Sequence, residues 1–175
     1  MRTLRRYLSL CALLFWQGGF LFYALVVIPI TGRVLGEKLL HLRAQITGAA
    51  TSWLNGVGVV ALALLLWDLA VSTDGSRFRN RGRGLAWAVL FFSLAVLFAL
   101  HYWLEVLDPP DSRGPSNPAA FGVAHTLYVV AAMVQSAAAL VYLGLTVSAW
   151  RTEDATDAAS KEGLEGGKEM AEKGK

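Results

Sequence analysis

Charged residues are missing from more than half of this sequence. Asp, Glu, Lys and Arg do not occur in four runs of 24, 22, 20 and 30 residues, which are Tyr7–Ile30, Ile46–Trp67, Leu85–Leu104 and Phe121–Trp150. About 20 apolar residues cross the hydrocarbon core of a bilayer as a helix, whereas a soluble core helix rarely stays uncharged for so long. The absence of charge therefore argues against an ordinary soluble domain and predicts four membrane spans.

Cysteine is scarce as well, because Cys11 is the single thiol in 175 residues. One thiol forms neither an intramolecular disulfide nor a CxxC redox pair, which excludes thiol–disulfide membrane enzymes of the quinone-linked type. The sequence also lacks a Gly-rich phosphate loop, a Ser–His–Asp constellation and an HxxxH or HExxH spacing. We therefore predict no catalytic residues and no cofactor, and the sequence favours a non-enzymatic protein.

The apolar runs are continuous, with Ala and Leu prominent. Strands of a membrane barrel instead alternate apolar and polar residues in segments of about ten. Inside lipid, the backbone of such continuous runs is satisfied by helices. We predict an all-α fold, an integral membrane four-helix bundle of up-down-up-down topology over residues 1–151.

The last part of the chain, residues 152–175, has the opposite composition. It holds seven acidic residues and four lysines and no aromatic residue. Such a segment cannot bury enough apolar surface to offset the entropy lost on ordering. A disordered, charged cytoplasmic tail is predicted, with an amphipathic helix around Ala158–Lys173 as the alternative.

The basic residues outside the spans predict the orientation. Without the tail lysines, eight lie on the side of the termini and four on the other side, and the larger number marks the cytoplasmic face. Both termini are therefore expected to be cytoplasmic, in the inner membrane if the source is bacterial. The basic run Arg77–Arg83 lies between two spans, so it predicts contact with anionic lipid and not with nucleic acid.

Three amides lie near the middle of their spans: Gln17, Asn55 and Gln135. Polar side chains at this depth usually face neighbouring helices or a cavity. They can hold the bundle together by hydrogen bonds between helices, or they can line the path of a small transporter or permease. The spans contain no acidic residue, which counts against proton-coupled transport.

Small residues mark two surfaces where helices can approach closely. Gly18 and Gly19 lie in the first run, and Gly48, Ser52 and Gly56 follow one another at four-residue spacing in the second. Such strips serve contacts within one bundle or between copies of a chain. A homo-oligomer or a membrane protein partner is therefore expected beside the lipid bilayer.

A second polar cluster is expected nearer the outer surface. His101 and Glu105 are four residues apart and share one helical face, and His125 lies at similar depth on the next, antiparallel helix. Two imidazoles and a carboxylate can hold a divalent metal, and two histidines can ligate a haem. The alternative is that each ring is an amphipathic interfacial residue whose nitrogen reaches water.

Short motifs in three of the spans suggest a family. They are Trp16-x-Gly18-Gly19 with Val26-Val27-x-Pro29, then Trp103-Leu104-Glu105 with Pro109, then Phe121-x-x-x-His125 continuing through Tyr128 to Val134-Gln135. Together they resemble the transmembrane-protein-205-like family, small four-span membrane proteins of unknown function. The resemblance covers the four spans and omits the tail. It implies a four-helix bundle and draws attention to Glu105 and His125, but it supplies no activity, substrate or cofactor.

Three functional hypotheses follow. The first is a non-enzymatic helix bundle that acts through protein or lipid contacts. The second is a small transporter with a polar path past Gln17, Asn55 and Gln135. The third is a membrane metal- or haem-binding redox protein that uses His101 and His125.

Overall fold

Every regular element of the described chain is a helix, which confirms the all-α prediction. The computed structural model describes residues 2–35, 40–72, 76–109 and 114–173, without the side chains of residues 40, 41, 43 and 161–173. In chain order the elements are α1 (Arg2–Phe22), the π-helical turn η1 (Tyr23–Val27), α2 (Ile28–Leu35), α3 (Leu40–Val71), α4 (Arg77–Leu107) and α5 (Pro118–Lys173).

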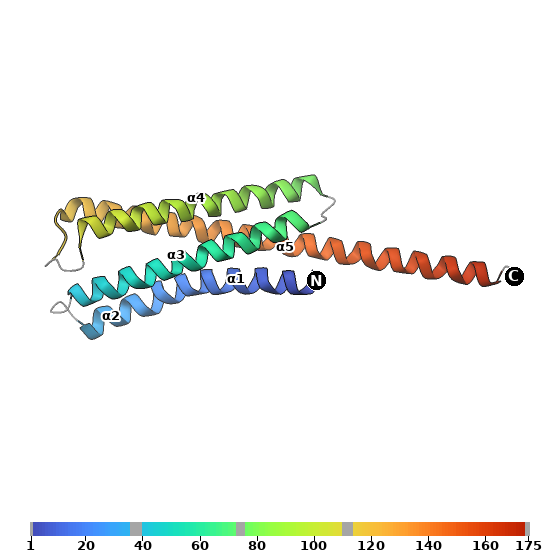
Figure 1. Ribbon diagram of the computed structural model, residues 1–175, viewed down its shortest axis with the longest axis horizontal. Coiled ribbons are helices and arrows are strands. Elements are labelled where there is room, and N and C mark those ends of the chain that lie inside the picture. Colours follow the sequence, from blue (N-terminus) through green and yellow to red (C-terminus); the bar gives the residue numbers. More distant parts are fainter. Residues whose placement is uncertain (1, 36–39, 73–75, 110–113, 174–175) are drawn as a thin grey trace.

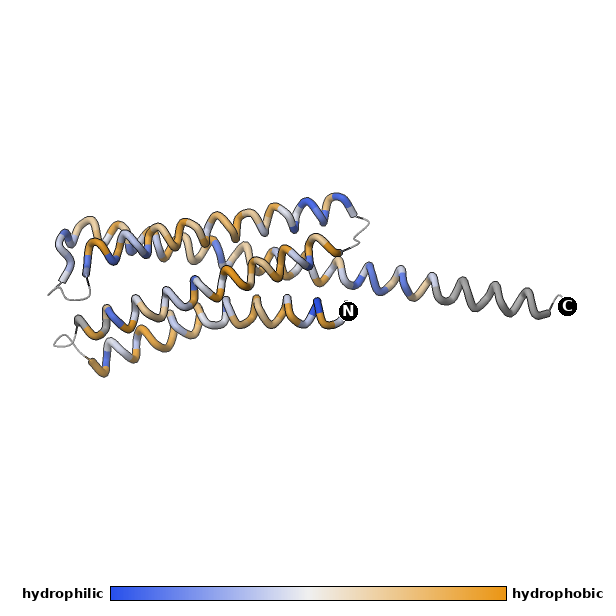
Figure 2. Tube along the Cα trace, in the orientation of Figure 1, coloured by the Kyte–Doolittle hydropathy of each residue, from blue (hydrophilic) through white to orange (hydrophobic). Residues whose placement is uncertain are grey.

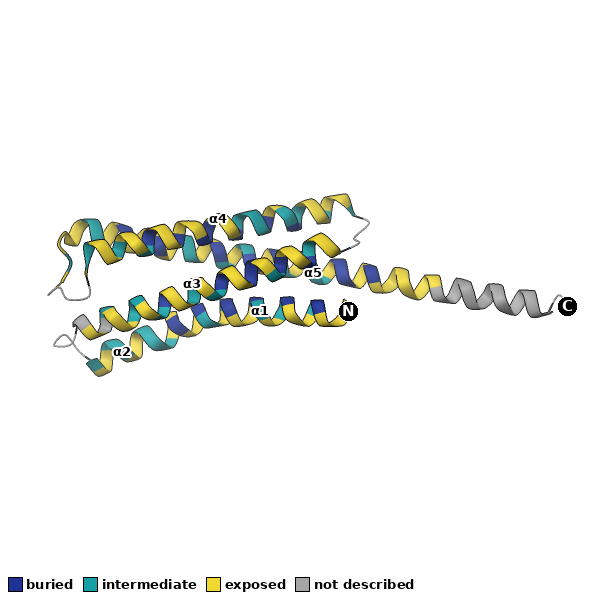
Figure 3. Ribbon diagram, in the orientation of Figure 1, coloured by how far each residue is buried: buried dark blue, intermediate teal, exposed yellow. Residues whose placement is uncertain are grey.

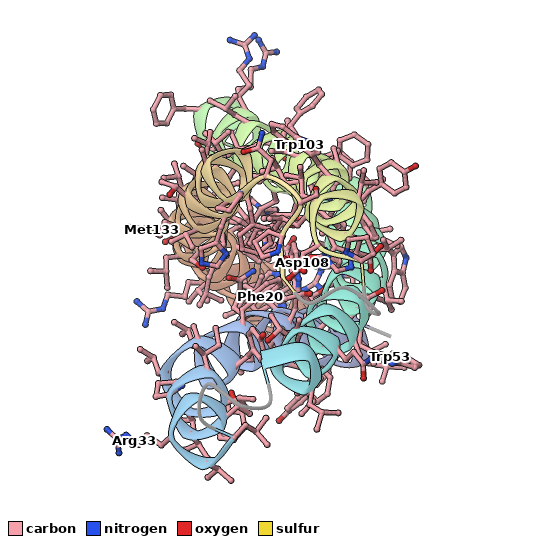
Figure 4. The ribbon with its side chains drawn as sticks, turned by 90° about the vertical axis from the view of Figure 1, so that its left-hand side faces the viewer. Phe20, Arg33, Trp53, Trp103, Asp108 and Met133 are labelled. Carbon is pink, nitrogen blue, oxygen red and sulfur yellow. The ribbon has the colours of Figure 1, made fainter. Side chains whose placement is uncertain are left out.

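These elements form four long rods, because α1, η1 and α2 are continuous (Figure 1). The start of α1, the end of α3 and the start of α4 lie at one end of the bundle, called here the terminal end. The end of α2, the start of α3, the end of α4 and the start of α5 lie at the far end. Seen from the far end, the rods follow one another in a ring, while Arg33, Trp53 and Met133 point away from it (Figure 4). The up-down-up-down topology is therefore confirmed.

The interior and the exterior of the bundle are both apolar. All four rods are long and apolar enough to cross a membrane, judged by length and composition, and Figure 2 shows hydrophobic residues along most of their length. The core includes fully buried Trp16, Leu65, Leu90 and Leu97. Large apolar side chains also cover the outside, which includes Phe15, Phe92 and Leu140 at 71%, 67% and 70% exposure.

The first rod continues past Pro29 because the helix widens before it. Proline has no N–H and its ring collides with the carbonyl four residues earlier in a regular helix. Here η1 precedes the proline, and the N–H of Ile28 donates to the carbonyl of Tyr23, five residues back. The hydroxyl of Thr31 then donates to the Val27 carbonyl at 2.7 Å. This π turn carries the rod to Leu35, five residues beyond the predicted end at Ile30.

The tail differs from the leading prediction. Instead of becoming disordered at Thr152, the chain continues as part of α5 through Lys173 and extends beyond the bundle (Figure 1). The alternative of a helical tail fits this part of the structure. Ala, Glu and Lys are strong helix formers, and carboxylates in the first turns after residue 152 pair with arginines of α1.

Of the small residues predicted to pack helices together, only Gly19 does so within the described part of this bundle. A Cβ atom added at Gly18, Gly48 or Gly56 meets open space, and Ser52 is exposed. The intramolecular role predicted for these positions is therefore wrong, and a contact between copies stays a prediction. The close approaches occur at Gly19, which was among the predicted packing positions, and at Gly58, which was not. A Cβ at Gly19 would come within 2.7 Å of Leu54, and one at Gly58 within 2.7 Å of Trp16.

Candidate functional site

The most heavily charged buried region lies at the terminal end, where all four rods contribute. We call it the ionic clasp and define it by Arg5 of α1, Asp68 of α3, Arg83 of α4 and Glu153 of α5. All four side chains are buried. Figure 3 shows buried segments of α5 continuing at this end, beside the start of α1.

Asp68 is the centre of the clasp and has no exposed surface. One carboxylate oxygen, Oδ2, lies 2.7 Å from Nη2 of Arg83, which is also fully buried. The other, Oδ1, lies 2.9 Å from Nε of Arg5. A single carboxylate thereby joins α1, α3 and α4.

Arg83 uses each of its three nitrogens. Besides the pair with Asp68, its Nε donates to the Thr146 hydroxyl at 3.1 Å and its Nη1 donates to the Ser72 hydroxyl at 2.9 Å. The guanidinium also lies over the ring of Tyr142, with 5.8 Å from Cζ to the centroid, a distance suited to a cation–π contact. These contacts bind α4 to α5 and to the end of α3.

Glu153 closes the network from the tail side. It accepts a hydrogen bond from the Ser72 hydroxyl at 2.9 Å and one from Nη2 of Arg6 at 3.0 Å. Nη2 of Arg5 lies 3.5 Å away. Arg6 also pairs with Asp154 at 2.9 Å and lies over the ring of Trp150. The first turn of the tail is therefore part of the bundle.

The sequence places these charges just outside the apolar runs. Arg5 and Arg83 each lie two residues before a run begins, Asp68 directly follows a run, and Glu153 lies three residues after one. Because consecutive rods are antiparallel, all four positions fall at the same end. Charged residues directly beside the apolar runs were the sequence signal for this cluster. The cluster was not predicted, because these residues were assigned to the connectors and the tail.

Two arginines balance two carboxylates within the clasp. Buried charges are tolerated when they are paired and hydrogen-bonded, and removal of one partner leaves the other uncompensated. The clasp therefore fixes the rotation and the height of all four rods relative to one another. Its charged groups pair with one another, so its contacts hold the four rods together at this end.

The three predicted intramembrane amides behave differently from one another. Gln17 makes the expected contact between helices, because its Oε1 accepts a hydrogen bond from the Ser136 hydroxyl of α5 at 3.0 Å. Asn55 and Gln135 are fully buried, but both amide atoms of Asn55 and Oε1 of Gln135 have no hydrogen-bond partner among the described residues. The Tyr128 hydroxyl lies near the Asn55 amide, but the two groups are not aligned for a hydrogen bond.

At the far end, His101 and Glu105 come together as predicted. Nε2 of His101 lies 3.3 Å from Oε1 of Glu105, and Nδ1 lies 3.4 Å from the Thr51 hydroxyl of α3. His125 is exposed and its ring stacks on Phe121, one turn earlier on its own helix.

His101 and His125 were predicted to lie close together, but the contacts of the two rings are with other residues. Among the residues that the structure describes, no group of three or more His, Cys, Asp and Glu side chains is placed to hold a metal ion. Binding of metal or haem by His101 and His125 stays a prediction.

Comparison with protein-family models, with curated proteins and with solved structures finds no match for this chain. The resemblance to the transmembrane-protein-205-like family accordingly stays a prediction. Function is inferred below from the contacts, burial and charge of the chain itself.

Proposed function

We propose that this chain is a non-enzymatic, multi-pass membrane bundle that acts through contacts with lipid or with other membrane proteins. The observation that carries the proposal is the apolar exterior, with large side chains such as Phe15, Phe92 and Leu140 facing outward on three rods. Monomeric soluble proteins rarely expose apolar surface on this scale. Such an apolar surface is stable when it contacts the hydrocarbon chains of a lipid bilayer.

The basic residues orient this bundle with the terminal end in the cytoplasm. A reporter fused after Lys175 is expected to be cytoplasmic, and a reporter inserted near Ser112 is expected to be external. An external reporter at the carboxyl terminus would overturn the orientation. A chain that is extracted from membranes by alkaline carbonate would overturn the membrane placement itself.

Photoreactive amino acids test whether the exterior makes specific contacts. Placed at the outward positions Phe92 and Leu140 in native membranes, they are expected to yield a discrete protein adduct from at least one face. Leu90 of α4, which has no exposed surface, is the matched inward control and should yield only intramolecular products. Lipid adducts alone at both outward positions would contradict the protein-contact role and leave lipid contact as the function.

The buried amides support a small transporter as the second candidate. Trp16 packs on Gly58, one turn from Asn55, while Gln17 bonds Ser136, the neighbour of Gln135. These contacts place the three amides at about one level of the bundle. A transporter would pass small uncharged solutes at this level, because the amides offer donors and acceptors but no charge.

Flux measurements separate the two candidates. The contact role predicts that vesicles containing the protein take up glycerol and urea no faster than empty vesicles. The transporter predicts faster uptake that is lost in Asn55→Leu and kept in Ser148→Ala, an exposed change on α5.

A further inference from the structure

We infer that Arg77, Phe78 and Arg81 of α4 form a binding surface for the phosphate headgroups of anionic phospholipids in the leaflet at the terminal end. We call these three residues the basic patch. The inference rests on the proposed membrane placement and goes beyond it by naming the lipid class and the residues that select it.

The geometry of the basic patch suits a phosphate at the side of the helix. Arg77 and Arg81 are four residues apart, so they lie one above the other on one face, and both are exposed. Phe78 has 87% of its surface exposed. An aromatic ring beside two guanidinium groups matches an interface where acyl chains and phosphates meet.

The charges of the basic patch are available, unlike those of neighbouring arginines. Arg2, Arg5, Arg6 and Arg83 each pair with a carboxylate of the chain. Arg79 is half-buried and makes a further interaction within the chain. Within the described ranges, neither Arg77 nor Arg81 contacts an acidic side chain. Of the basic run that predicted lipid contact, Arg77 and Arg81 are thus the exposed arginines that have no acidic partner in the part of the chain that the structure describes.

The height of the basic patch fits the headgroup layer. Arg81 and Arg77 precede Leu85, the first residue of the apolar run, by four and eight residues. At a rise of 1.5 Å per residue they lie about 6 Å and about 12 Å outside the hydrocarbon boundary. Each headgroup layer is about 5–8 Å thick. Arg81 therefore lies within it, whereas Arg77 lies about 4–7 Å beyond its outer surface, a distance that a long arginine side chain can span.

An anionic lipid is the occupant that these features favour. A guanidinium group binds a phosphate through two parallel hydrogen bonds, and lipid phosphates lie in the plane that the patch faces. A basic residue near an anionic membrane surface strengthens binding by about fivefold. Two arginines should therefore favour anionic over zwitterionic lipid by about 25-fold.

The test uses the full chain in vesicles of equal phosphatidylglycerol and phosphatidylcholine. After mild detergent extraction, the lipids that remain bound are counted by native mass spectrometry. The wild type is expected to keep phosphatidylglycerol preferentially, and the preference should fall about 25-fold in the double variant Arg77→Gln/Arg81→Gln. The double variant Arg77→Lys/Arg81→Lys should keep most of it, because lysine retains the charge. Arg33→Gln, which removes an exposed arginine at the far end, should leave it unchanged.

The outcomes separate this inference from the membrane placement. If the chain floats with the vesicles but binds both lipids equally, or if Arg33→Gln lowers the preference as much as the double glutamine variant, the basic patch is refuted and the membrane placement stands. If the chain does not float with vesicles, the membrane placement itself fails. A preference for phosphatidylglycerol that both double variants leave unaltered would likewise refute the basic patch.

Discussion

The terminal end and the middle of this bundle bury polar groups in opposite ways. At the terminal end, the ionic clasp buries four charged side chains, each facing an opposite charge within 3.5 Å. In the middle, Asn55 and Gln135 are as deeply buried, yet amide atoms on both have no hydrogen-bond partner among the described residues. The buried charges lie beside opposite charges, although Nε of Arg5 and Oδ1 of Asp68 are not aligned for a hydrogen bond. The unpartnered amide atoms have neither an ion pair nor a hydrogen bond within the described part of the chain.

The difference follows from the free energies of the two kinds of group. An ion without a partner in a medium of low dielectric constant is far more costly than an unpaired amide. A charged network therefore requires all its members in place, which makes it suited to define one arrangement of helices. Buried amides can lack a partner at lower cost. Their unpaired donors and acceptors therefore remain inside the bundle and can bind another polar group.

The largest loss of stability is expected when Asp68, the central carboxylate of the clasp, is replaced. Asp68→Ala leaves the buried Arg83 without its counter-charge, and breaking a buried pair from one side typically destabilises by about 3–5 kcal/mol. The loss is measured as the difference in the free energy of unfolding between Asp68→Ala and the wild type in detergent. Asp157→Ala is the control, because Asp157 pairs with Arg2 at the exposed surface, where a pair contributes about 0–1 kcal/mol. Equal losses in the two variants would show that the clasp is not effectively buried.

Packing between the two regions gives the next largest effect. A Cβ at Gly58 comes within 2.7 Å of the indole of Trp16, whereas one at Gly56 meets open space. Gly58→Ala should therefore destabilise the bundle by about 1–3 kcal/mol through overpacking. Gly56→Ala, two residues away on the same helix, should be neutral or slightly stabilising. The reverse order, read from thermal unfolding of both variants, would mean that the Gly56 face is the packed one.

The sequence predicted the number, order and direction of the rods because uncharged length alone defines them. It also predicted the Gln17 contact between helices and the pairing of His101 with Glu105, both of which depend on local spacing. It did not predict which face of each rod points inward. A helix that is apolar all round has no amphipathic signal to mark its buried side, so Gly58 and Gly56 were indistinguishable. The clasp was missed for a related reason, since charges that flank apolar runs look like connectors until the bundle brings them together.

Substitutions at the far end should lower the free energy of unfolding by less than those of Asp68 or Gly58. His101→Ala removes contacts with Thr51 and Glu105 and should destabilise the bundle by about 1 kcal/mol. His125→Ala changes an exposed residue and should stay within about 0.5 kcal/mol. Zinc content and haem absorbance of the purified variants provide a second measurement. Parallel loss of bound zinc or haem in both variants would show that the histidines share a ligand, whereas a stability difference without such loss would make His101 structural.

The smallest change in stability is expected for Asn55 in the middle of the bundle. This substitution tests most directly whether buried amides and buried charges differ. Leucine has nearly the shape of asparagine but no polar atom. Replacing a polar group that lacks a partner by an apolar group of similar shape is close to neutral or stabilising. Asn55→Leu is therefore expected to leave the free energy of unfolding unchanged within about 0.5 kcal/mol or to raise it, while Asp68→Leu should destabilise as Asp68→Ala does. A loss of more than about 2 kcal/mol in Asn55→Leu would mean that the amide is fully satisfied in the membrane. The middle and the terminal end would then follow one rule, and the hydrogen-bonding capacity that supports the transporter hypothesis would be absent.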